Sequence, residues 1–141
     1  MITVTEIRNV NYAAYDETWA IVRSLKNPGK MRRVPELSPS WALFKKYLRL
    51  RDAGQWNADT FKSIYVPTFL KEMAGMEAQR KLSELIELDK QGKRICMACF
   101  CRDEALCHRS IIAGIVQSAG IQVQGVKGDY SEYGRYKEIL C

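Results

Sequence analysis

The sequence predicts a single α/β domain built on an open, mostly parallel sheet with flanking helices. The chain has 141 residues, a length that suits one domain. Its composition, with 47% hydrophobic and 27% charged residues, is that of a soluble globular protein. The second half of the sequence has the pattern strand, loop, helix, strand, which is the unit of parallel sheets. We therefore expect one domain over residues 1–141, with one site or surface carrying the function.

The first half of the chain predicts two strands and a helix. Residues 2–8 alternate apolar and polar side chains, and residues 18–23 form a largely apolar run typical of a buried strand. After a loop, Ser38 offers a helix N-cap with Pro39 at the first helical position. This helix should stop at Gly54.

Two further helices are expected in the middle of the chain. Asn57 can cap the first of them, and Pro67 should kink or break it. The second covers residues 76–91, with Gly92 beyond its end in the left-handed region.

The remaining elements complete the sheet. Residues 94–100 form a short apolar run, as expected of a central strand buried on both faces. Helical spacing predicts a helix over residues 106–119, and residues 121–126 alternate again as a final strand. Apolar residues between positions 130 and 140 predict a short C-terminal helix: Tyr130, Tyr133, Tyr136, Ile139 and Leu140. Together these elements favour a Rossmann-like arrangement.

Cysteine and histidine are unevenly placed in the sequence. Four of five cysteines and the only histidine lie within residues 96–108, and Cys141 lies outside this window. An odd cysteine count without a recognisable secretory signal argues against a disulfide scaffold and for a cytoplasmic protein. No apolar segment is long enough to span a bilayer, so we expect no membrane partner. Strand alternation places Cys99 and Cys101 on one side and Cys96 on the other, so Cys96 is expected in the core.

The loop after residues 94–100 lies where open α/β sheets bind ligands. Cys107 begins a helix beside a histidine and an arginine, a setting that lowers the pKa of a thiol and favours a nucleophile. The same helix start can hold a phosphate or carboxylate. The candidate catalytic residues are therefore Cys107, His108 and Cys99, and the candidate ligand-binding residues are Arg109, Ser110, Cys101, Arg23 and Ser40.

Two other interpretations of this loop stay open. Cys99, Cys101, Cys107 and His108 are a complete set of ligands for tetrahedral zinc, although all four come from one loop. Alternatively, Cys107 packs as a small apolar residue, His108 hydrogen-bonds a neighbouring loop, and Arg109 pairs with Asp103 or Glu104. Side chains at adjacent helix positions point about 100° apart. We therefore expect that the side chains of Cys107 and His108 cannot both face the same point of the site equally well.

The positive charge is concentrated in one segment. The chain carries a net charge of +6, and residues 20–63 hold ten basic against three acidic side chains. This segment also contains five aromatic residues, namely Trp41, Phe44, Tyr47, Trp56 and Phe61, and adjoins Tyr65. Basic side chains among aromatics suit a phosphorylated ligand or a nucleic acid. The alternative is a solvated helix face whose aromatics turn into the core.

The cysteine loop resembles the domain-of-unknown-function 488 family, including its YeaO-like branch. Cys99 followed by Cys107-His108-Arg109 matches the spacing of the family, whereas Cys101 stands where the family usually has glutamate. Residues 37–40, followed by Leu43, are similar to the Ala-Pro-Ser helix start of the branch. The resemblance extends over nearly the whole chain and implies an α/β fold with a site at this loop.

These observations lead to two hypotheses of function. The first is an α/β protein that binds, and as a thiol- or histidine-dependent enzyme transforms, a phosphorylated nucleotide-like ligand at the Cys/His/Arg loop. The second is a basic nucleic-acid-binding module whose cysteine loop is structural and held by zinc.

Overall fold

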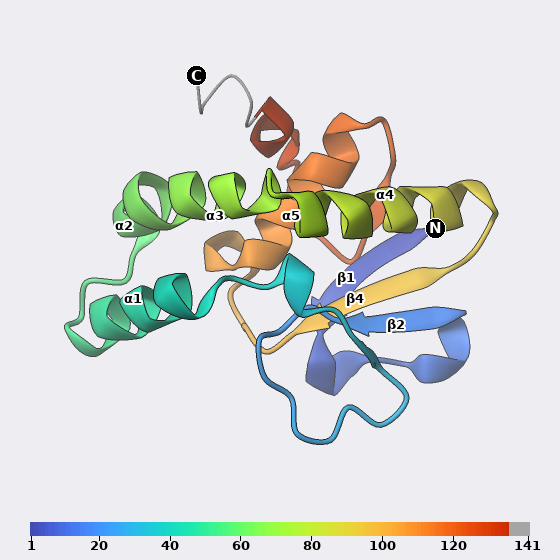
Figure 1. The fold of residues 1–141 in the computed structure, drawn as a ribbon, viewed down its shortest axis with the longest axis horizontal. Coiled ribbons are helices and arrows are strands. Elements are labelled where there is room, and N and C mark those ends of the chain that lie inside the picture. The colour runs from blue at the N-terminus through green and yellow to red at the C-terminus, as the bar shows by residue number, and fades with distance from the viewer. Residues whose placement is uncertain (136–141) are drawn as a thin grey trace.

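The computed structural model describes residues 1–135 and confirms the predicted α/β fold (Figure 1). Five parallel strands form one open sheet in the order β3-β2-β4-β1-β5. The strands are β1 (Ile2–Glu6), β2 (Glu17–Ala20), β3 (Arg32–Arg33), β4 (Ile95–Cys99) and β5 (Val123–Gln124).

Strand β4 is the central strand, as its apolar run predicts. It pairs with β1 and β2 on its two sides, and all five of its residues are buried. The register places Cys99, its last residue, opposite Glu6 at the end of β1. The loop after Cys99 therefore emerges from the middle of the carboxyl edge of the sheet.

Strands β1, β2 and β5 are shorter than the sequence pattern predicts. Residues 7–9 form a 3-10 turn instead of extending β1, and β2 ends at Ala20, so Val22 and Arg23 belong to the following loop. Strand β5 ends before Gly125, whose φ of 82° lies in the left-handed region.

Within residues 1–135, five α-helices and several short turns connect these strands. A π-helical turn over Phe61–Tyr65 joins α2 to α3, and 3-10 turns include Pro35–Leu37, Glu104–Leu106 and Ser131–Arg135. The helices are α1 (Trp41–Asp52), α2 (Ala58–Thr60), α3 (Val66–Met73), α4 (Met76–Lys90) and α5 (His108–Ser118).

Ser40, and not Ser38, caps α1. The Ser40 hydroxyl accepts a hydrogen bond from the Leu43 amide at 3.2 Å, whereas the Ser38 hydroxyl donates to the Pro35 carbonyl at 2.6 Å. The prediction of Ser38 as the cap was wrong because residues 35–37 form a separate turn that uses Ser38 at its own end. The helix ends two residues before Gly54, which has a φ of 69°.

The middle helices begin and end close to the predicted residues. The Asn57 side chain accepts from the Thr60 amide at 3.0 Å and caps α2. Pro67 lies in the first turn of α3, directly after the π turn, where the wider backbone accommodates a residue without an N–H. Gly92 follows α4 with a φ of 80°, as predicted.

The two faces of the sheet are covered differently. The main core lies between the sheet and α3, α4 and α5, and Ile95, Met97 and Cys99 face it (Figure 1). The opposite face carries a small cluster around Ala20 and Ala98, covered by the loops that follow β1 and β2. Cys99 therefore points toward the helices, as strand alternation predicts.

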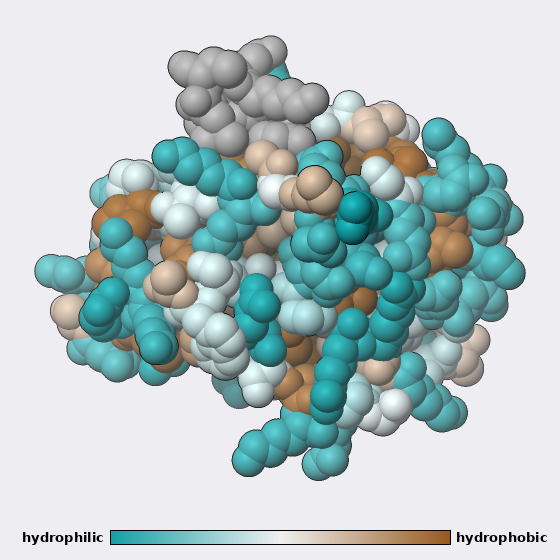
Figure 2. Space-filling view, viewed as in Figure 1, coloured by the Kyte–Doolittle hydropathy of each residue, from teal (hydrophilic) through white to brown (hydrophobic). Residues whose placement is uncertain are grey.

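The surface seen in Figure 2 is mostly hydrophilic, with small hydrophobic groups between the charged side chains. Within residues 1–135, none of the helices is both long and apolar enough to span a membrane. Tyr133, in the last 3-10 turn, is buried against the core. Tyr130 precedes this turn directly and also packs against the core. The remaining residues expected in a C-terminal helix, Tyr136, Ile139 and Leu140, lie outside the described residues, as does Cys141.

Candidate functional site

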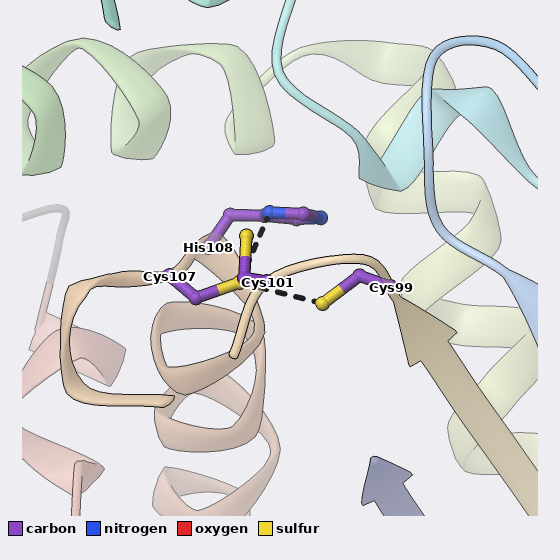
Figure 3. A group of neighbouring side chains, drawn as sticks. All are labelled: Cys99, Cys101, Cys107 and His108. Atoms are coloured by element: carbon purple, nitrogen blue, oxygen red, sulfur yellow. Dashed lines mark hydrogen bonds between the residues drawn. The ribbon is translucent and has the colours of Figure 1, made fainter. Parts of the chain in front are cut away.

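Three cysteines and the histidine converge where β4 meets α5. Cys99 ends β4, Cys101 follows in the loop, Cys107 caps α5 and His108 is its first residue. One ligand atom from each of the four side chains lies within 4.8 Å of all the others. The Cys99 and Cys107 Sγ atoms are 3.4 Å apart, and Cys107 Sγ is 3.6 Å from Nδ1 of His108 (Figure 3). We call these four residues the thiol-imidazole cluster.

Cys107 and His108 point to the same spot, which corrects the expectation that they would compete. Cys107 has φ −128° and ψ 147°, so its backbone is extended and the 100° step between helical residues does not apply to it. Its side chain turns back toward Cys99, while His108 reaches over it from the first helical turn.

The orientation of His108 is fixed by the loop after β2. Its Nε2 lies 2.7 Å from the carbonyl oxygen of Ile21, and an edge-on contact with Phe69 holds the ring at 5.6 Å between centroids. A carbonyl oxygen can only accept, so Nε2 carries the proton. In the neutral imidazole, Nδ1 therefore presents its lone pair to the cysteines.

Arg109 lies against the thiol-imidazole cluster and organises its loop. Its Nη1 donates to the Cys101 carbonyl at 2.6 Å and contacts Cys99 Sγ at 3.6 Å, and its Nη2 donates to the Arg102 carbonyl at 3.5 Å. The guanidinium is largely buried by these contacts. It places a positive charge beside the sulfur atoms.

The three thiols of the cluster differ in acidity. Hydrogen bonds from Cys101 and Cys107, together with the nearby positive charge of the Arg109 guanidinium, hold the pKa of Cys99 well below its usual value. Burial raises the pKa of Cys107. The hydrogen bond from Cys107 lowers the pKa of Cys101, but the bond to Cys99 and burial outweigh it and raise that pKa to about 12. The first negative charge of the cluster therefore resides on Cys99.

An open pocket of about 160 Å³ lies directly beside the cluster. Its floor is formed by Cys101, Cys107 and His108, so the cluster opens into the pocket on one side. The walls come from α1 and the loop after it, the π turn, and the loops after β2 and β4. They are mostly aromatic: Trp41, Phe44, Tyr47, Trp56, Tyr65 and Phe100.

The aromatic walls combine rigid and exposed rings. Trp56 packs edge-on against Tyr47 and Tyr65, with ring centroids 4.7 and 5.5 Å away, so the inner rings brace one another. Trp41 and Phe100 are 51% and 57% exposed although both line the pocket. Two large apolar side chains thus stand in solvent at its mouth.

Arg23 supplies the positive charge of the pocket lining. Its Nε donates to the Pro39 carbonyl at 3.1 Å, which fixes the plane of the guanidinium. Among residues 1–135, no side chain or carbonyl accepts a hydrogen bond from its two terminal nitrogens. The pocket therefore has one positioned cation with free donors.

Four of the predicted site residues lie outside the pocket lining, and one of them is Cys99 at the end of β4. Ser110 is buried and its hydroxyl donates to the Cys107 carbonyl at 2.8 Å. The Ser40 hydroxyl donates to a Glu72 carboxylate oxygen at 2.6 Å, and Arg109 faces the thiol-imidazole cluster from behind. Cys96 is buried on the opposite face of β4, as expected, and burial raises its pKa to about 11.

The basic and aromatic residues of α1 separate onto different sides. Trp41, Phe44 and Tyr47 line the pocket, whereas the basic side chains of the helix face solvent. The exposed basic residues are Lys45, Lys46, Arg49 and Arg51. The charged side chains of α1 thus form a solvent-exposed face. Its aromatic side chains line the pocket and do not serve only as core residues.

Sequence reasoning missed two contributors to the site. Phe100 follows Cys99 directly, and alternation alone would place it on the far side of the sheet, but the strand ends at Cys99 and releases it into the pocket. A hydrogen bond from His108 to a neighbouring loop is one of the interpretations of the sequence, but the sequence does not identify the Ile21 carbonyl as the acceptor, since any residue supplies a carbonyl.

A family model described as "Active DUF488-N3 subclade" matches residues 4–120. The matched range contains the whole thiol-imidazole cluster and every residue that lines the pocket. The chain has no match among curated proteins or solved structures.

Proposed function

The chain belongs to the active DUF488-N3 subclade of the domain-of-unknown-function 488 family. We propose that its pocket binds a phosphorylated, nucleotide-like ligand. The observation that carries the proposal is the composition of the pocket. Aromatic rings, one cation with free donors and a polar floor surround a single small space. A planar heterocycle that bears an anionic group complements all three.

The aromatic walls are the evidence for the ring part of the proposed ligand. Stacking of a base on an aromatic side chain contributes about 1–3 kcal/mol per base, and Trp41 and Phe100 expose their rings at the mouth. The volume of about 160 Å³ is smaller than that of pockets for drug-sized ligands, which hold roughly 300–1,000 Å³. The pocket thus accommodates the ring of a nucleotide and leaves its sugar and phosphate at the mouth.

Arg23 is the evidence for the phosphate part of the proposed ligand. Its two terminal nitrogens form a fork that can donate two parallel hydrogen bonds to phosphate oxygens. Arg109 and Ser110, the other candidates for this role, already donate to backbone carbonyls of the cysteine loop. We therefore assign the phosphate to Arg23.

The thiol-imidazole cluster gives the ligand polar contacts at the floor. Cys101 is only partly buried and lines the pocket, so it is the thiol that a bound ring meets. Cys107 and His108 line the floor beside it, and Cys99, the most acidic thiol, lies behind them. Of the candidate catalytic residues, Cys107 and His108 are thus the two placed to contact a ligand directly.

Nucleic acid is the second candidate ligand, and the exposed basic side chains of α1 favour it. Such binding would depend on phosphate contacts along a strand, and its affinity would fall steeply with salt. It would also depend on the outward basic residues and not on Arg23.

Both candidates are tested by titrating the purified protein with the four nucleoside monophosphates, the matching nucleosides and a short single-stranded oligonucleotide. Tryptophan fluorescence and calorimetry report the binding, since Trp41 and Trp56 line the pocket. We expect saturable binding of at least one monophosphate. Arg23→Ala should weaken the monophosphate and leave the nucleoside unchanged, while Trp41→Ala weakens both.

The matched control is Arg49→Ala, which removes a cation from the solvated face of α1. It should leave monophosphate binding unchanged. If the parent protein binds no monophosphate or nucleoside at millimolar concentration, the proposal is wrong. If only the oligonucleotide binds, and Arg49→Ala weakens it more than Arg23→Ala, nucleic acid is the ligand.

A further inference from the structure

We propose that Cys99, Cys101, Cys107 and His108 bind one zinc ion beneath the pocket. This site goes beyond the proposed ligand binding and does not depend on it. Its basis is the convergence of four soft or borderline donor atoms, one from each side chain, within 4.8 Å of one another.

The distances in the cluster are close to those of a tetrahedral zinc site. With Zn–S bonds of about 2.3 Å and a Zn–N bond of about 2.0–2.1 Å, the sulfur atoms of a tetrahedron lie about 3.8 Å apart and sulfur and nitrogen about 3.6 Å apart. The Cys99 and Cys107 Sγ atoms are 3.4 Å apart, and Cys107 Sγ is 3.6 Å from His108 Nδ1. The longest separation in the cluster, at most 4.8 Å, needs to close by only about 1 Å.

The histidine already has the tautomer that a metal requires. Its Nε2–H donates to the Ile21 carbonyl at 2.7 Å, so Nδ1 is free of a proton in the neutral ring and faces the sulfur atoms. Metal-binding histidines commonly hold their second nitrogen in this way, because it fixes the ring and raises its basicity. This hydrogen bond comes from a loop 87 residues earlier and is independent of the cysteine spacing.

The charge of the surroundings also suits zinc. Three thiolates and one Zn²⁺ carry a net charge of −1, and the buried guanidinium of Arg109 lies 3.6 Å from Cys99 Sγ. Its positive charge balances the complex, so a buried ion would not be left uncompensated.

The backbone resolves the objection that four ligands from one short loop cannot surround a metal. Cys99 approaches from a strand end, and Cys107 turns back through its extended backbone. His108 comes from a helix, and Cys101 comes from the loop between strand and helix. Four protein ligands leave no open position, so the zinc has a structural role and orders the pocket floor.

The test measures zinc in protein purified without chelator from zinc-supplemented cells. Mass spectrometry of the metal content should give one zinc per chain. After removal of zinc, added Co²⁺ should produce the visible bands of a tetrahedral cobalt ion together with near-ultraviolet thiolate-to-cobalt charge transfer. A parent protein with neither zinc nor these bands would overturn the site, as would a Cys99–Cys107 disulfide, seen as a loss of two hydrogens in intact mass.

Single substitutions locate the ion. Cys101→Ser changes the least buried of the three thiols, so the variant is expected to fold, and it should lower the cobalt charge-transfer intensity by about one third because two of three thiolates remain. The matched control is Cys96→Ala, which removes a buried thiol from the other face of β4 and should keep one zinc. Equal zinc content and equal cobalt spectra in both variants would contradict the assignment. Zinc content is independent of nucleotide binding, so the two proposals can fail separately.

Discussion

The Nε2 atom of His108 lies 2.7 Å from the carbonyl oxygen of Ile21, so the loop after β2 holds the first residue of α5. This bond connects the two sides of the pocket, because Val22 and Arg23 follow Ile21 directly and His108 forms part of the floor. The position of the phosphate-binding candidate, the tautomer of the histidine and the geometry of the cysteines thus depend on one another.

Two substitutions of His108 test the roles of its two ring nitrogens separately. The amide nitrogen of glutamine can replace Nε2–H as donor to the Ile21 carbonyl, but glutamine has no nitrogen lone pair for zinc. We expect His108→Gln to lose zinc while its metal-free form stays within about 1 kcal/mol of the metal-free parent in stability. His108→Ala should lose zinc and also destabilise the metal-free protein by about 1–3 kcal/mol, since the carbonyl loses its buried partner.

Urea unfolding of the metal-free proteins, together with zinc content, checks this prediction. Equal stability of the glutamine and alanine variants would show that the bond to Ile21 is unimportant. Retention of zinc by either variant would exclude His108 as a ligand.

Arg109 should tune metal affinity without binding the metal. Arg109→Gln removes the charge beside Cys99 and at least one of the bonds to the loop carbonyls. Loss of such supporting contacts typically lowers metal affinity about 10–100-fold. Competition with a chromophoric chelator measures the change, and the exposed Arg102→Gln serves as the control from the same loop. An unchanged zinc affinity in Arg109→Gln would contradict this role.

Ser40 should affect stability and leave ligand binding unchanged. Its hydroxyl caps α1 and donates to Glu72 at 2.6 Å, outside the pocket. Loss of an N-cap costs about 0.5–2 kcal/mol, so Ser40→Ala should lower the free energy of unfolding by that amount. Calorimetry with a nucleoside monophosphate should give Ser40→Ala the same affinity as the parent protein. A weaker affinity in the variant would show that Ser40 takes part in ligand binding.

Because its thiol is buried, Cys96 should make the folded protein less stable in alkaline solution. Burial raises its pKa from the usual 9.0 to about 11 in the folded protein. Below pH 9.0 both the folded and the unfolded chain hold the proton, but between pH 9.0 and about 11 the unfolded chain releases it first. The free energy of unfolding should therefore fall across this window and level off above it.

The comparison with Cys96→Ala isolates this effect, because all other titrating groups are shared. Urea unfolding at several pH values should show a steeper alkaline loss in the parent than in the variant. Parallel curves would mean that the Cys96 thiol ionises equally in both states.

The sequence predicts the placement of the cysteines better than their orientation. Apolar runs and alternation locate β4 in the centre of the sheet, with Cys99 facing the helices and Cys96 away from them. The predicted direction of the Cys107 side chain was wrong because it assumed a helical backbone. Cys107 is the N-cap of α5 and has an extended backbone, and the sequence does not reveal which residue is the cap. The same ambiguity misplaced the cap of α1 at Ser38, one of two serines on either side of Pro39.

The sequence predicts a ligand site at the carboxyl edge of the sheet, but it does not predict the aromatic walls of the pocket. These walls come from α1 and the loop after it, the π turn and the loop after β4, which only the tertiary fold brings together. The basic aromatic pattern of residues 20–63 indicates a phosphate-binding surface, but it cannot tell that the aromatics turn inward and most of the charges outward.

A crystal structure of the protein grown with zinc and the tightest-binding nucleoside monophosphate tests the account most directly. We predict anomalous density for one zinc between Cys99, Cys101, Cys107 and His108, with the base near Trp41 and Phe100 and the phosphate on Arg23. An empty cluster, or a nucleotide bound on the outer face of α1 away from the pocket, would contradict it.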